Sequence, residues 1–65
     1  MISIGDKVRV VSECWWSNSQ GKFALQGLEG QVYDVGFGDD EDELYVLIPS
    51  VGHVLLIISD VEVIK

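Results

Sequence analysis

The sequence predicts a small all-β domain, and three observations lead to that prediction. The chain has 65 residues, the size of a single domain. Its apolar runs are short and rich in valine and isoleucine, a composition typical of strands. Seven glycines and one proline separate these runs, and no window carries a convincing helical stripe. We therefore expect one domain over residues 1–65, built from short strands.

The first predicted strand is Lys7 to Val11, where valines alternate with Lys7 and Arg9 as in a half-buried strand. The second runs from about Glu29 to Val35. Just before and at its start, Gly27 and Gly30 are expected to supply a positive φ angle or a close backbone approach. These features place a tight turn at the entrance to the second strand.

The second half of the chain predicts three more strands. The third strand is Leu44 to Ile48, which stops at the proline, and the fourth is His53 to Ile58. A short turn of 3₁₀ type is expected at Ser59-Asp60, followed by a closing strand from Glu62 to Ile64. The chain thus contains about five short antiparallel strands.

A loop of about ten residues is predicted between the first two strands, from Ser12 to Lys22. Trp15 and Trp16 lie in it side by side, so in an extended segment they cannot both point into the core. One of them is expected at the surface, where tryptophan is a typical binding anchor. Phe23 and Leu25 are expected to point inward.

Five short strands, a long first loop and a late 3₁₀ turn are the layout of SH3-like barrels. An open five-stranded sheet or an OB-like barrel is the alternative, but OB folds usually have an intervening helix, and none is predicted here. Closing the sheet into a barrel would remove most of its exposed edge.

The third and fourth strands are apolar on both faces, although only one face of a barrel strand points inward. The second face carries Tyr45 and Leu47 on one strand and Leu55 and Ile57 on the other. We expect the long first loop to cover this face, because large exposed apolar patches are uncommon on monomers. A partner chain, or self-association, is the alternative cover. These four residues, with Trp15 and Trp16, form the predicted partner-binding surface.

The net charge of −7 excludes several partners. A phosphate backbone or an anionic membrane surface would repel this chain, so nucleic-acid binding and membrane adsorption are not expected. Five consecutive acids form a predicted hairpin tip: Asp39, Asp40, Glu41, Asp42 and Glu43. This tract is interpreted as a solvated loop or as a patch that attracts a basic partner. Consecutive acids do not have the spacing of a calcium loop, so no metal site is predicted.

Few residues could support catalysis. Cys14 is the only thiol and His53 the only histidine, and nothing in their spacing requires them to meet. We predict no catalytic, cofactor-binding or metal-binding residue. One cysteine allows no internal disulfide, which favours a reducing, cytoplasmic location. No signal peptide or membrane-spanning run is predicted, since the longest apolar run, Val54 to Ile58, is far too short.

Two stretches carry a resemblance to a known family: Gly5-Asp6-Lys7-Val8-Arg9-Val10, and the run from Phe23 to Val32 that reads FALQGLEGQV. Their spacing resembles that of the variable (alpha) chain of ferredoxin–thioredoxin reductase, and the ending from Asp60 to Ile64 is similar as well. The resemblance covers about half the chain. Similar strand, turn and strand segments occur in other SH3-like proteins, including the photosystem I PsaE subunit and KOW modules.

This resemblance implies an SH3-like barrel that holds no cofactor and stabilises a catalytic chain carrying an iron–sulfur cluster. Catalytic residues of that family lie in the other subunit, so none is carried over. A reducing plastid stroma would then be the alternative to the cytoplasm. The acidic tract Asp39 to Glu43 and the apolar run Val54 to Ile58 depart from the family pattern.

Two hypotheses for function follow. The first is a non-catalytic accessory subunit of electron transport that stabilises a redox partner chain, as the reductase variable chain does. The second is a stand-alone acidic interaction module, of phage or mobile-element type, that binds a basic target.

Overall fold

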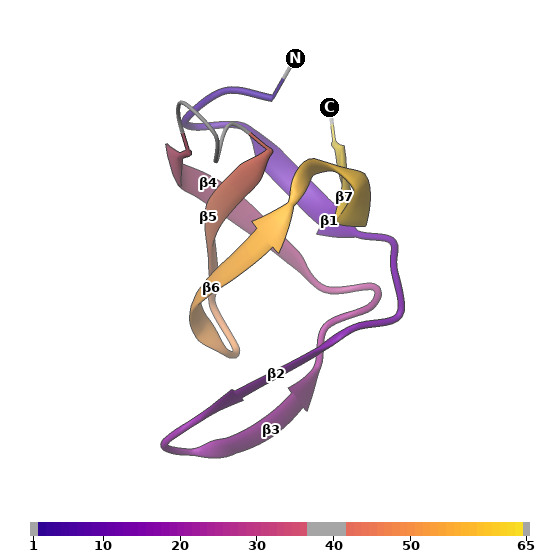
Figure 1. The fold of residues 1–65 in the computed structure, drawn as a ribbon, viewed down its shortest axis with the longest axis vertical. Helices are drawn as coiled ribbons and strands as arrows, with labels where there is room; N and C mark the ends of the chain where they lie inside the picture. Colours follow the sequence, from indigo (N-terminus) through magenta and orange to yellow (C-terminus); the bar gives the residue numbers. More distant parts are fainter. Residues whose placement is uncertain (1, 37–41, 65) are drawn as a thin grey trace.

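The computed structural model describes residues 2–36 and 42–64, which form an all-β domain of seven strands (Figure 1). The strands are β1 (Lys7–Val10), β2 (Trp15–Asn18), β3 (Gly21–Ala24), β4 (Glu29–Val35), β5 (Glu43–Ile48), β6 (Gly52–Ile57) and β7 (Val61–Val63). A single 3₁₀ turn, η2 (Ile58–Asp60), precedes β7 within the described part of the chain. The prediction of a small all-β domain with this late turn is confirmed.

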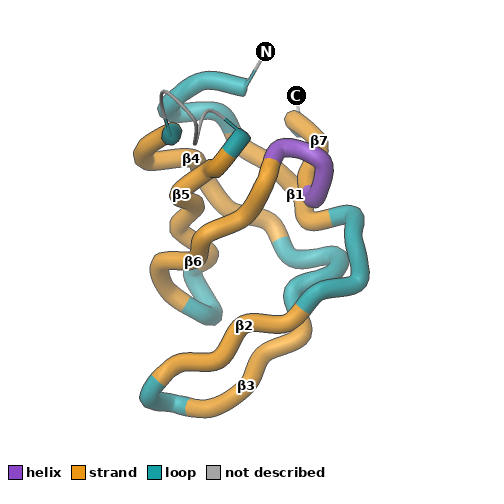
Figure 2. The backbone as a smooth tube through the Cα atoms, in the orientation of Figure 1, coloured by secondary structure: helices purple, strands orange, loops and turns teal. Residues whose placement is uncertain are grey.

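Five strands form one antiparallel sheet in the order β6-β5-β4-β1-β7, while β2 and β3 form a separate hairpin. The first and last of the sheet strands in sequence, β1 and β7, are neighbours, with Val8 opposite Val63. The β2–β3 hairpin extends from one end of the sheet (Figures 1 and 2). This is the arrangement of an SH3-like barrel, with the hairpin between β1 and β4, the first two strands of the main sheet, and the 3₁₀ turn before the last strand.

The hairpin occupies the segment that the sequence predicts as a long loop. Asn18 stabilises its turn, because the Asn18 Oδ1 accepts a hydrogen bond of 2.8 Å from the Gln20 backbone N–H. Gly21 follows with a φ of +131°. No residue of β2 or β3 is fully buried, so the hairpin lacks the apolar alternation that reveals a strand in a sequence.

The core lies on the inner face of the sheet. Its buried side chains come from the five strands of the sheet and, for Leu25, from the segment between β3 and β4: Val8, Val10, Leu25, Val32, Leu44, Val46, Ile48, Val54, Leu56 and Val61. Aliphatic side chains dominate it, and both β5 and β6 bury every second residue. The apolar strands of the sequence thus have one face in the core and one face left over.

Two glycines confirm the expectation for the entrance to β4. Gly27 has a φ of +88°, a region that favours glycine. Gly30 is buried with no positive φ, but a Cβ atom there would lie 2.5 Å from the Leu47 backbone oxygen. Glycine at this position therefore permits the close approach of β4 and β5.

The SH3-like arrangement still leaves two strands of the described sheet at its edges. β6 and β7 are the two ends of the strand order, and neither pairs with the hairpin. The hairpin is connected to the sheet near the β5–β6 turn, where the Asn18 Nδ2 donates to the Val51 carbonyl over 3.3 Å. The two small sheets are therefore joined by packing and side-chain contacts, leaving β6 as an open edge.

Candidate protein-binding face

The candidate site is the face of β4, β5 and β6 that points away from the core. We call it the outer face and define it by six residues: Tyr33, Tyr45, Leu47, His53, Leu55 and Ile57. Strand register places these side chains in neighbouring rows, with Leu47 opposite His53 and Tyr45 opposite Leu55. Side chains that alternate with the buried residues of β5 and β6 necessarily share this face.

A β-bulge in β4 positions the aromatic part of the outer face. The pairing of β4 with β5 shifts between Val32 and Asp34, so Tyr33 is the extra residue. Its ring centroid lies 6.2 Å from that of Tyr45 and 4.8 Å from that of His53. Since His53 is on β6, the Tyr33 side chain reaches across β5 and links all three strands.

The outer face is open to solvent. Tyr33 is 43% exposed, Leu47 42%, Leu55 40% and Ile57 46%, while Tyr45 is half-buried. The expectation that the first loop covers this face is wrong. That segment forms the β2–β3 hairpin, whose Trp16 and Phe23 pack against the core cluster instead.

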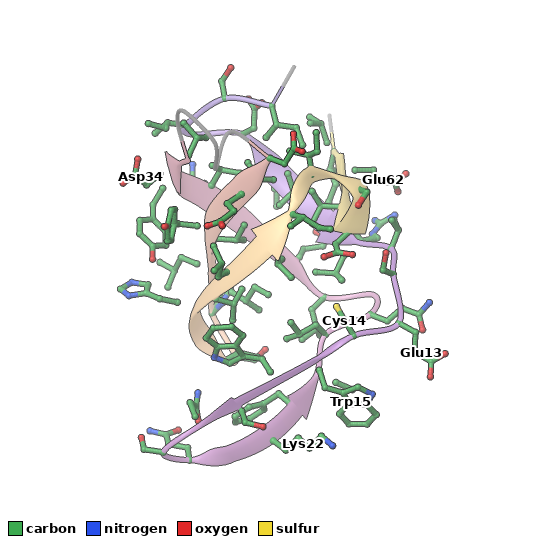
Figure 3. All side chains as sticks on the ribbon, viewed as in Figure 1. Glu13, Cys14, Trp15, Lys22, Asp34 and Glu62 are labelled. Carbon is green, nitrogen blue, oxygen red and sulfur yellow. The ribbon has the colours of Figure 1, made fainter. Side chains whose placement is uncertain are left out.

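The structure assigns different environments to the two adjacent tryptophans. Trp16 is half-buried against the core and lies opposite Phe23. Trp15 is 57% exposed, and the Lys22 ammonium lies 5.1 Å from its ring centroid (Figure 3). Trp15 is therefore the surface tryptophan, as alternation requires of one member of the pair. It lies on the hairpin, apart from the outer face.

Only part of the predicted acidic tract lies in the described chain. Asp39, Asp40 and Glu41 are outside the described residues, Asp42 is exposed, and Glu43 begins β5 opposite Ile57. Asp34 lies opposite Tyr45 on the neighbouring strand. Asp34 and Glu43 therefore place negative charge beside the same end of the outer face. Figure 3 shows Asp34 far from Trp15.

The structure separates the two residues considered for nucleophilic chemistry. His53 lies on the outer face against Tyr33, whereas Cys14 packs against the core cluster on the other side of the sheet. Burial raises the pKa of the Cys14 thiol, and the Asp60 carboxylate raises it further. A raised pKa disfavours the thiolate that a nucleophile requires.

Residues 2–36 and 42–64 contain no group of three or more side chains placed to hold a metal ion. In the same residues, no helix has the length and apolar character to cross a membrane. Comparison with protein-family models, with curated proteins and with solved structures gave no match for this chain. The site is therefore interpreted from its own residues.

Tyr33 and His53 are the members of the outer face that the sequence-based prediction omitted as binding residues. Alternation along β4 directs Tyr33 away from the core, because its neighbour Val32 is buried. Alternation along β6 likewise directs His53 away from the core, because its neighbour Val54 is buried. That signal was present in the sequence. The sequence does not indicate the aromatic contact across three strands, because that contact depends on the bulge in β4.

Proposed function

We propose that this chain is a non-catalytic interaction subunit that binds a protein partner through its outer face. The observation behind the proposal is the apolar, aromatic surface that Tyr33, Leu47, Leu55 and Ile57 leave exposed on three adjacent strands. Although the chain carries a net charge of −7, the outer face is apolar, so its exposure to water is unfavourable. A contiguous apolar patch with a polar rim is typical of a protein–protein interface.

The rigidity of the outer face supports this use. The ladder between β5 and β6 runs from Glu43 opposite Ile57 to Ile48 opposite Gly52 without a shift in register. Tyr33 is held by ring contacts to both Tyr45 and His53. Side chains that are already ordered lose less conformational entropy on binding, which favours affinity.

The chemistry of the face indicates the kind of partner. Leucine, isoleucine and tyrosine favour an apolar counter-surface, and the acids Asp34 and Glu43 at one end favour basic residues at its rim. The resemblance to the variable chain of ferredoxin–thioredoxin reductase leads us to propose a redox chain with an iron–sulfur cluster as that partner. The subunit would then act by stabilising that chain, with no reaction of its own.

A second function rests on charge alone. The acidic tract from Asp39 to Glu43 and the net charge of −7 would suit a stand-alone module that binds a basic target. Binding of this kind weakens steeply with salt, because the charges involved are exposed. An apolar interface persists in salt, so ionic strength separates the two proposals.

The test is an anaerobic pull-down from the native extract, with a tag after Lys65 and parallel washes at low and high salt. We expect an iron-containing chain that remains bound at high salt. Leu47→Ser, on the middle strand of the outer face, should remove that partner. Ile58→Ser is the matched control, since Ile58 is 44% exposed but lies in η2 outside the outer face.

Equal retention by Leu47→Ser and Ile58→Ser would reject the outer face as the binding site. A basic partner that is released by salt, and lost when Asp39 to Glu43 are changed to amides, would support the acidic module instead.

A further inference from the structure

The two edges of the five-stranded sheet differ in how they are protected. β7 has only three residues and carries Glu62, whose carboxylate lies 3.7 Å from the Arg9 guanidinium. Short length and charge are ordinary protections of an edge strand. β6 has six residues, Gly52–Ile57, with no charged acid or base and no proline. It is therefore an edge that could pair with another strand.

The hydrogen-bond pattern shows which backbone groups of β6 are directed outward. The Ile58 N–H donates to the Asp42 carbonyl over 2.9 Å, which marks one end of the β5–β6 ladder. Bonded pairs alternate in an antiparallel ladder, so every second residue before Ile58 bonds to β5. The intervening residues, His53, Leu55 and Ile57, direct their N–H and C=O groups away from β5. In the described chain, none of these groups has a backbone partner on another strand.

Charge favours a second copy of this chain over a charged partner at this edge. Residues 44–58 contain no Asp, Glu, Lys or Arg, although the whole chain carries a net charge of −7. Two copies would repel each other through most of their surfaces, but least where their β5–β6 hairpins meet. The partner best suited to an uncharged, apolar strand edge is another edge of the same kind.

We propose that β6 pairs with β6 of a second copy, antiparallel, about a two-fold axis at Leu55. The three outward residues are symmetric about Leu55, so the same residues on the copy can satisfy them. His53 then lies opposite Ile57 of the copy, and Leu55 lies opposite its own equivalent. Such an isologous interface closes on itself and forms a dimer. The two outer faces become one continuous surface.

The pairing forms four inter-chain hydrogen bonds without disturbing either fold. Two join the Leu55 residues, and one runs from the His53 N–H of each copy to the Ile57 carbonyl of the other. The Ile57 N–H is not required, since it already faces the Asp60 Oδ2 at 3.4 Å. That distance exceeds the usual 2.7–3.2 Å of an N–H···O bond, so this hydrogen bond is weak. The Asp60 side chain can therefore move aside when the second strand approaches. This inference concerns the edge of the sheet and does not rest on the proposed function of its outer face.

Disulfide trapping of the purified chain tests both the dimer and its register. Leu55→Cys is made in a Cys14→Ser background, and the protein is oxidised mildly without any partner present. Directly opposed residues of a bonded pair lie about 5.5 Å apart between Cα atoms, within the range of a disulfide. We expect a covalent dimer from Leu55→Cys. Leu47→Cys is the matched control, because it is equally exposed but lies on β5, away from the axis.

Sedimentation equilibrium of the unmodified chain supplies the second measurement. We expect the mass to rise from 7.2 kDa toward twice that value with concentration, and the dimer to strengthen with added salt as like charges are screened. Leu55→Lys should raise the dimer Kd about tenfold, equivalent to roughly 1.4 kcal/mol, through opposed ammonium groups. Circular dichroism checks that this variant remains folded.

Two results would overturn the proposal. One is a mass of 7.2 kDa at all concentrations, because the edge would then be unpaired. The other is a dimer that cross-links no faster through Leu55→Cys than through Leu47→Cys, which would place the interface elsewhere.

Discussion

On the β5–β6 hairpin, Leu55 and Leu56 are adjacent and chemically identical, but one is 40% exposed and the other 5%. Leu56 packs in the core with the inner residues of β5, whereas Leu55 lies on the outer face opposite Tyr45. The same contrast holds along both strands. Apolar character alone therefore does not define the core of this protein, since each of these strands has two apolar faces and the fold buries only one.

The largest expected effect is the difference between Leu56→Ala and Leu55→Ala. Truncating a buried leucine costs about 2–5 kcal/mol, because it removes apolar contacts and leaves a cavity. A domain of 65 residues has only several kcal/mol of stability in total, so Leu56→Ala should be largely unfolded or close to it. Leu55→Ala should lose less than about 1 kcal/mol. Urea unfolding at low protein concentration measures both, and equal losses would contradict the division into inner and outer faces.

A smaller effect is expected from Gly30→Ala, which tests packing on the inner face of β4. The new Cβ would lie 2.5 Å from the Leu47 backbone oxygen and 2.8 Å from the Val46 Cγ1, so the strands would have to separate. Overpacking of this kind costs about 1–3 kcal/mol. Thermal unfolding is the measurement. The control is Glu29→Ala, an exposed neighbour whose ion pair with Arg9 contributes about 0–1 kcal/mol. An unchanged melting temperature in Gly30→Ala would show that β4 and β5 are not in this close contact.

The smallest effect concerns Cys14, on the core side of the sheet. Its pKa is raised in the folded state by burial, and secondarily by Asp60, so the folded chain keeps the proton more strongly than the unfolded chain. Stability should therefore be complete below the ordinary thiol pKa of about 8.5 and decrease as the pH rises through it toward the raised value. Urea unfolding between neutral and alkaline pH measures this slope. Cys14→Ala removes the titrating group and should flatten the profile; an identical slope in both proteins would assign it to other groups.

The sequence predicts the main sheet well because its strands show local patterns, namely apolar alternation and turn residues. Valine alternation in β1 and the glycine turn before β4 are local features, and β4 has the bounds Glu29–Val35 that its pattern predicts. The hairpin is different. Trp15 to Ala24 pairs through exposed and half-buried residues, so nothing local distinguishes its strands from a loop.

The candidate site shows the same division. Alternation alone places Tyr45, Leu47, Leu55 and Ile57 on one face, and the sequence predicts them as a group. Whether the first loop covers that face depends on where the loop packs, which is a long-range contact. In the fold, Trp16 and Phe23 pack against the core, so the face stays open.

The fold class, the positions of the five sheet strands, the acidic charge and the two-sided apolar character of β5 and β6 follow from the sequence alone, because each depends on composition or on neighbours along the chain. Tertiary structure decided which apolar face is buried, which tryptophan is exposed, how Tyr33 reaches His53, and that β6 remains an edge. These properties depend on which strands meet. Contacts between residues distant in sequence are set by the packing of the whole chain, so no local pattern encodes them.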